Sequence, residues 1–265
     1  YIQSKYDVWK FDPTGKKAPV CVTQGKGKAT RTVYRITADI FSKAHIDRDY
    51  RGYLQPGDPL WFQTFNEESK ENGLATINMT LRKPQLQTLQ QGPWTYSSML
   101  GSRATKKPTF VSVRGNFESG NNLWIYKMFA SEEKITDINP QQADYRWGSV
   151  ELVKWTTYNG HPAEGILYTP DDIDSTKKYP VIVYFYERMS QELYQPRNPA
   201  PSRSVINPAW FVSNGYCVFM PDIYYETGHP GKSAYDYILS GCDKICERPW
   251  RDGDNMAIQG QSWGG

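Results

Sequence analysis

The chain has 265 residues, of which 38% are hydrophobic and 22% are charged, so it can form one or two globular domains and lacks the composition of a disordered protein. Its formal net charge of +3 is too small, and its basic residues are too scattered, to predict nucleic-acid binding. No apolar run approaches the roughly 20 residues that a membrane-spanning helix needs. We therefore expect a soluble protein with no nucleic-acid partner and no membrane-spanning segment.

Both ends of the sequence are unusual. It starts Tyr1-Ile2-Gln3-Ser4, without an initiator methionine or a signal segment, and it stops at Gly265, directly after the pattern Gly-Gln-Ser-Trp-Gly. We expect further chain beyond both ends. The sequence does not fix the compartment, and an extracytoplasmic location is our working assumption.

The four cysteines do not make a disulfide framework in a chain of this length. Cys217 lies in an apolar run, and Cys242 and Cys246 are four residues apart, which places them on one face of a helix. A metal site would need further ligands nearby in the sequence, and none follows. We therefore expect buried thiols, no metal and no cofactor.

The first 148 residues predict short strands separated by turns. Residues 6–11 run through a turn at 12–15 into residues 19–23, which predicts a hairpin. Two later pairs of segments repeat this shape: residues 74–79 with 85–89, and residues 122–129 with a polar turn at 131–133 and then residues 134–137.

These units lie roughly 50 residues apart, the period expected of four-stranded propeller blades. We predict two to three blades of a partial β-propeller over residues 1–148. Because a propeller typically needs at least four blades, the rest of the ring should precede Tyr1. An ordinary β-sandwich is the alternative for this region.

The pattern changes near Ser149. Asn159-Gly160 separates two β-favouring runs and is a strong hairpin signal, and residues 179–186 form the continuous apolar run of a strand buried on both faces. A short helix at 207–215, capped by Asn207, a strand at 216–222, a helix at roughly 233–247 and a strand at 255–259 follow, the last entered from a turn-rich stretch at 251–254. Residues 149–265 thus predict the first part of an α/β domain.

The last strand leads into Gly260-Gln261-Ser262-Trp263-Gly264. In an α/β-hydrolase, G-x-S-x-G sits on a sharp strand-to-helix turn, where the glycines relieve crowding and the serine hydroxyl is exposed above the sheet. The strand, the tight turn and the serine arrive in the order that a nucleophile elbow requires. The alternative is a glycine-rich turn in which Ser262 is an ordinary turn hydroxyl.

Residues 178–186, 214–222 and 256–265 resemble the prolyl oligopeptidase family of serine peptidases, in particular its dipeptidyl-peptidase-IV-like and acylaminoacyl-peptidase-like branches. The resemblance covers nearly the whole chain, and its last segment is the most specific. It implies a β-propeller followed by an α/β-hydrolase domain that ends here at the nucleophile elbow. The family junction is expected near Ser149, where the composition also changes.

The resemblance also implies roles for individual residues. Ser262 matches the nucleophile, and the backbone N–H of Trp263 and the hydroxyl of Tyr186 match the two oxyanion-hole donors. Gly260 and Gly264 match the glycines of the elbow. The chain departs from the family directly after Tyr186, where residues 187–191 replace a small loop that contains Gly-Pro.

A serine hydrolase needs a base and a carboxylate, and in this fold both follow the serine along the chain. His45, His161 and His229 all precede Ser262, so we expect none of them to be the base, and we expect residues 1–265 to be inactive by themselves. Two pairs, Glu67-Glu68 and Glu132-Glu133, invite comparison with the glutamates that bind a substrate amino terminus in dipeptidyl-peptidase-like members. We expect both pairs to be solvated turns.

The leading hypothesis is a serine peptidase that cleaves peptides through an acyl-enzyme on Ser262. One alternative is an esterase or acyl hydrolase, because the same elbow serves both reactions. Another is a binding protein that uses the propeller and has a catalytically dead hydrolase domain. Peptides are the expected substrates, and a homodimer of the complete protein is left open.

Overall fold

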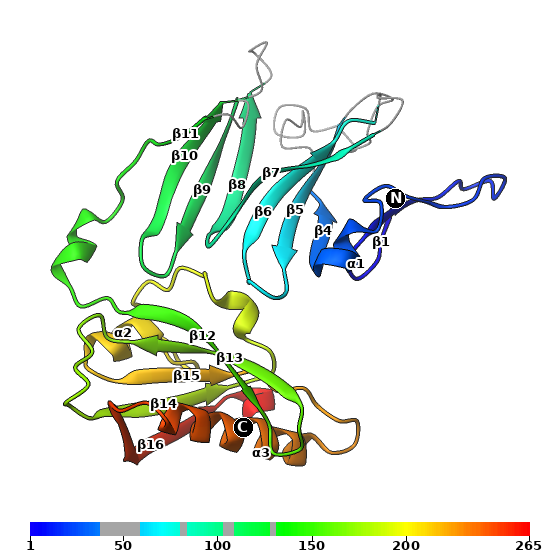
Figure 1. Ribbon diagram of the computed structural model, residues 1–265. Coiled ribbons are helices and arrows are strands. Elements are labelled where there is room, and N and C mark those ends of the chain that lie inside the picture. Colours follow the sequence, from blue (N-terminus) through cyan, green and yellow to red (C-terminus); the bar gives the residue numbers. More distant parts are fainter. Residues whose placement is uncertain (38–58, 80–83, 103–108, 128–130) are drawn as a thin grey trace. The chain divides into compact units, whose positions relative to one another are not determined.

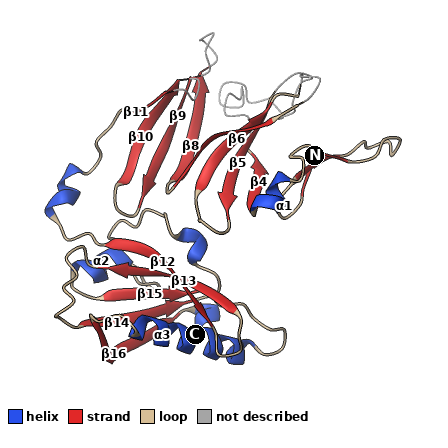
Figure 2. Ribbon diagram, viewed as in Figure 1, coloured by secondary structure: helices blue, strands red, loops and turns tan. Residues whose placement is uncertain are grey.

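The computed structural model describes all residues except 38–58, 80–83, 103–108 and 128–130 (Figure 1). It divides into two compact units. The first contains residues 1–115 and 121–137, and the second contains residues 116–120 and 138–265. Figure 2 shows that the first unit is almost entirely strand and loop, whereas the longer helices belong to the second.

The described residues of the first unit form three antiparallel sheets. A three-stranded sheet contains β1 (Ile2–Gln3), β2 (Val8–Lys10) and β3 (Val20–Cys21), and the pairing of β2 with β3 confirms the hairpin predicted there. A four-stranded sheet has the order β4 (Thr32–Ile36), β5 (Leu60–Asn66), β6 (Asn72–Ile77), β7 (Leu86–Gly92). The short helix α1 (Lys26–Thr30) precedes it.

A second four-stranded sheet has the order β11 (Ser131–Lys134), β10 (Gly120–Lys127), β9 (Thr109–Asn116), β8 (Thr95–Ser102). The polar turn predicted at residues 131–133 is wrong, because Ser131–Lys134 pairs with β10 as an edge strand. All four residues of β11 are exposed, so no hydrophobic alternation marks them as a strand.

Along several strands of this unit, buried side chains alternate with more exposed ones. In β5, Leu60, Phe62 and Thr64 are buried while their neighbours are more exposed. Leu74 of the first four-stranded sheet packs with Phe110 and Tyr126 of the second, whose rings stack at 4.5 Å. The two four-stranded sheets therefore share one hydrophobic cluster, as expected of packed β units.

The second unit contains a five-stranded sheet with the order β12-β13-β15-β14-β16. Its strands are β12 (Ser149–Thr156), β13 (Pro162–Thr169), β14 (Tyr179–Phe185), β15 (Cys217–Pro221) and β16 (Arg251–Gly260). The pairing of β12 with β13 across Asn159-Gly160 confirms that predicted hairpin. β13 and β15 are antiparallel, whereas β14 is parallel to both β15 and β16.

One helix packs on each face of this sheet. Along β15, Cys217 and Phe219 belong to a core cluster with α3 (Pro230–Cys246), whereas Val218 and Met220 belong to the cluster with α2 (Pro208–Ser213). Because successive side chains of a strand point to opposite faces, α2 and α3 cover opposite faces. The Asn207 side chain caps α2 as predicted, accepting a hydrogen bond from the Trp210 N–H at 3.3 Å.

Two boundaries differ from the sequence predictions. Helix α3 begins at Pro230, three residues earlier than expected, because proline fits the first helical turn. The turn predicted at residues 251–254 is part of β16: Arg251 pairs with Tyr179 and Met256 with Val181, so the residues between them form an irregularity within the strand. Three 3-10 turns complete the unit, Pro140–Asp144, Ser190–Glu192 and Ser262–Gly264.

Candidate active site

The candidate site lies where three parallel strands end. β14, β15 and β16 run in the same direction, so their carboxyl ends meet at one edge of the sheet, the usual position of ligand sites in such sheets. The residues that follow these strands form an open pocket of about 720 Å³, lined by Tyr186, Glu187, Tyr225, Ser262 and Trp263. The structure thus brings together the three residues that the sequence predicted for the chemistry, Ser262, Tyr186 and Trp263.

Ser262 occupies a sharp turn immediately after β16. Its φ of 55° lies in the left-handed region, whereas the preceding Gln261 is extended. Hydrogen bonds from Gly264 N–H to Gln261 O and from Gly265 N–H to Ser262 O, both 3.0 Å, close the turn. A left-handed conformation costs a residue with a side chain about 1–2 kcal/mol, so the rest of the turn must hold Ser262 in it.

The two glycines of the motif are required by space. A Cβ atom on Gly260 would lie 1.6 Å from the carbonyl oxygen of Gly264, and one on Gly264 would lie 2.2 Å from the carbonyl oxygen of Phe185. Both obstacles are backbone atoms, which cannot turn aside as a flexible side chain could. The chain can therefore pass from β16 around Ser262 and back against the end of β14 only with glycine at both positions.

Tyr186 and Trp263 are both accessible at this pocket. Tyr186 directly follows β14 and is 39% exposed, and Trp263 is 53% exposed. The Trp263 ring meets the ring of Tyr225 edge-on, with 5.3 Å between ring centroids. The hydroxyl of Tyr225 donates a 2.8 Å hydrogen bond to the backbone carbonyl of Tyr186.

Two residues at this edge escaped the sequence analysis. Tyr225 belongs to the segment after β15, and nothing in its local sequence distinguishes it from the adjacent Tyr224. Asp222, directly after β15, is 1% exposed and accepts hydrogen bonds from the N–H groups of Met189 and Ser190 at 2.6 and 2.7 Å. Burial raises the pKa of Asp222, while these hydrogen bonds oppose the rise. The only feature of the sequence that could have indicated Asp222 is its position, a carboxylate directly after a buried strand.

The described histidines do not reach Ser262. His161 lines a different pocket, shared with Asn159 and Asp236, and His229 precedes the first turn of α3. Neither lines the pocket of Ser262. His45 lies outside the described residues.

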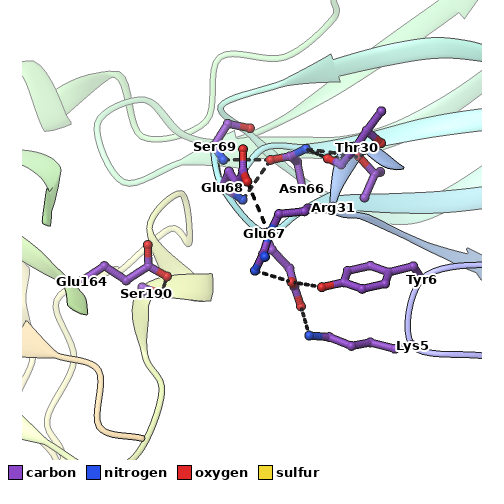
Figure 3. Close-up of polar contacts among 11 residues, drawn as sticks. Lys5, Tyr6, Thr30, Arg31, Asn66, Glu67, Glu68, Ser69, Glu164 and Ser190 are labelled. Carbon is purple, nitrogen blue, oxygen red and sulfur yellow. Dashed lines mark hydrogen bonds and ion pairs between the residues drawn. The ribbon is translucent and has the colours of Figure 1, made fainter. Parts of the chain in front are cut away.

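The glutamate pairs divide in a way that the sequence did not predict. Glu67 accepts a 2.6 Å hydrogen bond from the Tyr6 hydroxyl and lies 3.2 Å from both Lys5 Nζ and Arg31 Nη2, as Figure 3 shows. Burial opposes the effect of these partners, yet the hydrogen bonds from Tyr6 and Lys5 leave the pKa of Glu67 below its ordinary value. Glu68 is two-thirds exposed and meets Arg31 at 3.4 Å.

Glu132 likewise has a partner. Its carboxylate lies 2.8 Å from Nη1 of Arg114, a side chain only 4% exposed whose guanidinium also contacts the rings of Trp94 and Trp124. Glu133 forms only a 3.8 Å contact between exposed side chains, with Lys127. The expected solvated position is thus correct for Glu68, Glu133 and Glu132, which is 41% exposed although it pairs with Arg114, and wrong for Glu67, whose side chain is 20% exposed. The turn expected for Glu132 and Glu133 is wrong, because both lie in β11.

The cysteines are free thiols. Burial raises the pKa of Cys217 to about 12 and that of Cys242 to about 11, so both stay protonated at neutral pH. In the described part of the chain, no group of three or more His, Cys, Asp or Glu side chains is arranged to hold a metal ion. Within the same residues, none of the helices has the length and hydropathy to cross a membrane.

No protein-family model matches the sequence, and no curated protein matches it either. Solved structures do match. Dipeptidyl peptidase 4 of Porphyromonas gingivalis matches with a TM-score of 0.61 and 15% identity, over 97% of this chain and 35% of that one. A post-proline cleaving enzyme from Rickettsia typhi matches with a TM-score of 0.60 and 12% identity, over 95% of this chain and 34% of that one.

An acylaminoacyl peptidase from Pyrococcus horikoshii matches with a TM-score of 0.53 and 14% identity, over 78% of this chain and 32% of that one. These structures combine a propeller with an α/β-hydrolase domain. The chain spans about a third of the length of the structures it matches. Over that third it has the fold of prolyl-oligopeptidase-type peptidases, including the dipeptidyl-peptidase and acylaminoacyl-peptidase proteins that the sequence resembles.

Proposed function

We propose that this chain carries the nucleophile of a serine peptidase of the prolyl oligopeptidase type. In this proposal residues 1–148 form the last blades of a β-propeller, and residues 149–265 form the first part of an α/β-hydrolase domain. The single observation that carries it is Ser262 at φ 55° directly after a parallel strand, between two glycines that admit no Cβ. The peptidases among the matched structures support the same reaction class.

The chemistry follows from the geometry of the edge. The Ser262 hydroxyl attacks the carbonyl carbon of a peptide bond, its proton passes to a base, and an acyl-enzyme forms as the amine leaves. The Trp263 N–H and the Tyr186 hydroxyl donate hydrogen bonds to the oxygen that becomes negative in the transition state. Preorganised donors of this kind are worth about 10²–10³-fold in kcat each.

The base and the acid belong, in this proposal, to residues outside 1–265. His161 and His229 line no part of the Ser262 pocket, and both precede the serine, against the chain order of this fold. In this proposal, residues 1–265 alone therefore bind the carbonyl group of a peptide bond but do not hydrolyse that bond. In this proposal the propeller limits the substrates to small or unfolded ones.

The test is labelling of the full-length gene product with a fluorophosphonate, which reacts with an activated serine, together with turnover of peptide and ester substrates. We expect labelling of the wild-type protein on Ser262 and loss of about 10⁶-fold in kcat for Ser262→Ala. Ser202→Ala, a change at an exposed loop serine outside this pocket, is the matched control. Full peptidase activity in Ser262→Ala refutes the proposal.

The same assay separates the alternatives. Labelling with turnover of esters but not of peptides indicates an acyl hydrolase. A full-length protein with no labelling and no turnover indicates a catalytically dead binding protein.

A further inference from the structure

The loop after β14 and the loop after β15 are joined by a continuous set of hydrogen bonds. Asp222 holds the N–H groups of Met189 and Ser190 through one oxygen and the Ser190 hydroxyl, at 2.6 Å, through the other. The Ile223 N–H donates to the Glu187 carbonyl at 2.8 Å. The backbone that follows Tyr186 is therefore fixed by the segment Asp222–Ile223, which is buried.

Tyr225 completes this set at the pocket itself. Its hydroxyl donates to the Tyr186 carbonyl at 2.8 Å, and its ring stands edge-on to Trp263 at an interplanar angle of 76°. One side chain thus touches both residues that would supply the oxyanion hole. Burial raises the pKa of Tyr225, against a hydrogen bond from the Trp263 side chain that lowers it, so the hydroxyl stays protonated and keeps its role as donor at neutral pH.

We propose that Tyr225 is a positioning residue that sets the separation of the Tyr186 hydroxyl and the Trp263 N–H. This inference rests on the proposed function, because it concerns the oxyanion hole of that reaction. Tyr225 anchors the backbone of Tyr186 through its hydroxyl and fixes the turn that carries Trp263 through its ring. The two donors come from loops far apart in the sequence. A third group that contacts both loops therefore fixes the distance between the donors.

The consequence is an effect on the transition state rather than on substrate binding. A ground-state carbonyl is neutral and tolerates a loose donor, whereas the developing oxyanion requires both donors at hydrogen-bond distance. Loss of the Tyr225 hydroxyl should therefore lower kcat and leave KM nearly unchanged.

The experiment uses the full-length gene product and Tyr225→Phe, which keeps the ring against Trp263 and removes the two hydrogen bonds of the hydroxyl, to the Tyr186 carbonyl and with the Trp263 side chain. We expect kcat and the rate of fluorophosphonate labelling to fall by about tenfold with unchanged KM and melting temperature. Tyr225→Leu, which also removes the ring contact, should fall further. Tyr158→Phe is the matched control, because it also removes a tyrosine hydroxyl, one bonded to Asp243 at 2.5 Å outside the pocket, and should behave as wild type.

A double-mutant cycle with Tyr186→Phe separates positioning from a general structural role. If Tyr225 acts through the Tyr186 hydroxyl, Tyr225→Phe should have a much smaller effect once that hydroxyl is gone. Equal effects in both backgrounds, an effect on KM alone, or wild-type kinetics of Tyr225→Phe each overturn the inference. Absence of Ser262 labelling in the wild-type protein overturns the proposed function as well, so the two failures are distinguishable.

Discussion

Replacement of Gly264 by alanine tests the candidate elbow most directly. The added Cβ would lie 2.2 Å from the Phe185 carbonyl oxygen and 3.2 Å from its carbonyl carbon, where about 3.4 Å is the ordinary contact distance. To remove this clash, the backbone of the turn and the backbone at the end of β14 must move apart by roughly 1 Å. Overpacking costs typically 1–3 kcal/mol, and a clash between two backbone segments should cost at least the upper figure.

The expected result has two parts. Urea unfolding of Gly264→Ala should show a lower midpoint with an unchanged slope, equivalent to about 3 kcal/mol. Labelling of Ser262 in the full-length protein should slow by about 10²-fold, because a displacement of about 1 Å in a catalytic group has that effect.

Gly231→Ala is the matched control. No atom lies within 4 Å of the Cβ position of Gly231, which is in the first turn of α3. This change should leave labelling unaltered and stabilise the chain by about 0.4–1 kcal/mol. Wild-type stability and labelling in Gly264→Ala would refute the tight passage of the chain between β16 and β14.

Three further tests, with four substitutions, concern the framework. Glu132→Gln removes the counter-charge of the buried Arg114 but keeps an acceptor oxygen, and Glu132 is 41% exposed, so it should cost about 1.5 kcal/mol, whereas Glu133→Gln at an exposed pair should cost less than about 0.5 kcal/mol; urea midpoints compare them. Burial raises the pKa of Asp222, so the folded chain binds its proton at a higher pH than the unfolded chain. The contribution of Asp222 to the free energy of unfolding should therefore increase as the pH falls through the folded pKa towards the unfolded value of about 3.9. Asp222→Asn should make the free energy of unfolding less dependent on pH in that range. Asn207→Ala removes the cap of α2 and should lower stability by about 1 kcal/mol in thermal unfolding.

Elements that carry their own local signal could be predicted from the sequence. The apolar run of β14 and the Asn-Gly turn between β12 and β13 are examples, since each depends on residues that are neighbours in the chain. β11 could not be predicted in this way. Its four exposed polar residues become a strand only because β10 offers an edge for pairing.

The same distinction holds at the candidate site. Ser262 and its glycines stand in one motif, and Tyr186, at the end of an apolar run, matches a tyrosine of the family that the sequence resembles, so both could be named before the structure. The hydrogen bond from Tyr225 to Tyr186 joins residues that are 39 positions apart, so no local sequence pattern predicts it. The pairing of Arg114 with Glu132 could not be predicted for the same reason, because Arg114 of β9 and Glu132 of β11 are on strands separated by β10, and two tryptophans contact the guanidinium.

The place of β16 in its sheet has a practical consequence. β16 is at one end of the five-stranded sheet, with β14 as its neighbour among the described strands, and Ile258 in its middle is 73% exposed. An outer strand with apolar side chains and unused backbone donors and acceptors is a template for pairing with another chain. A preparation that contains only residues 1–265 should therefore self-associate as its concentration rises. An increase in its light scattering would then indicate association through the edge of the sheet and not unfolding.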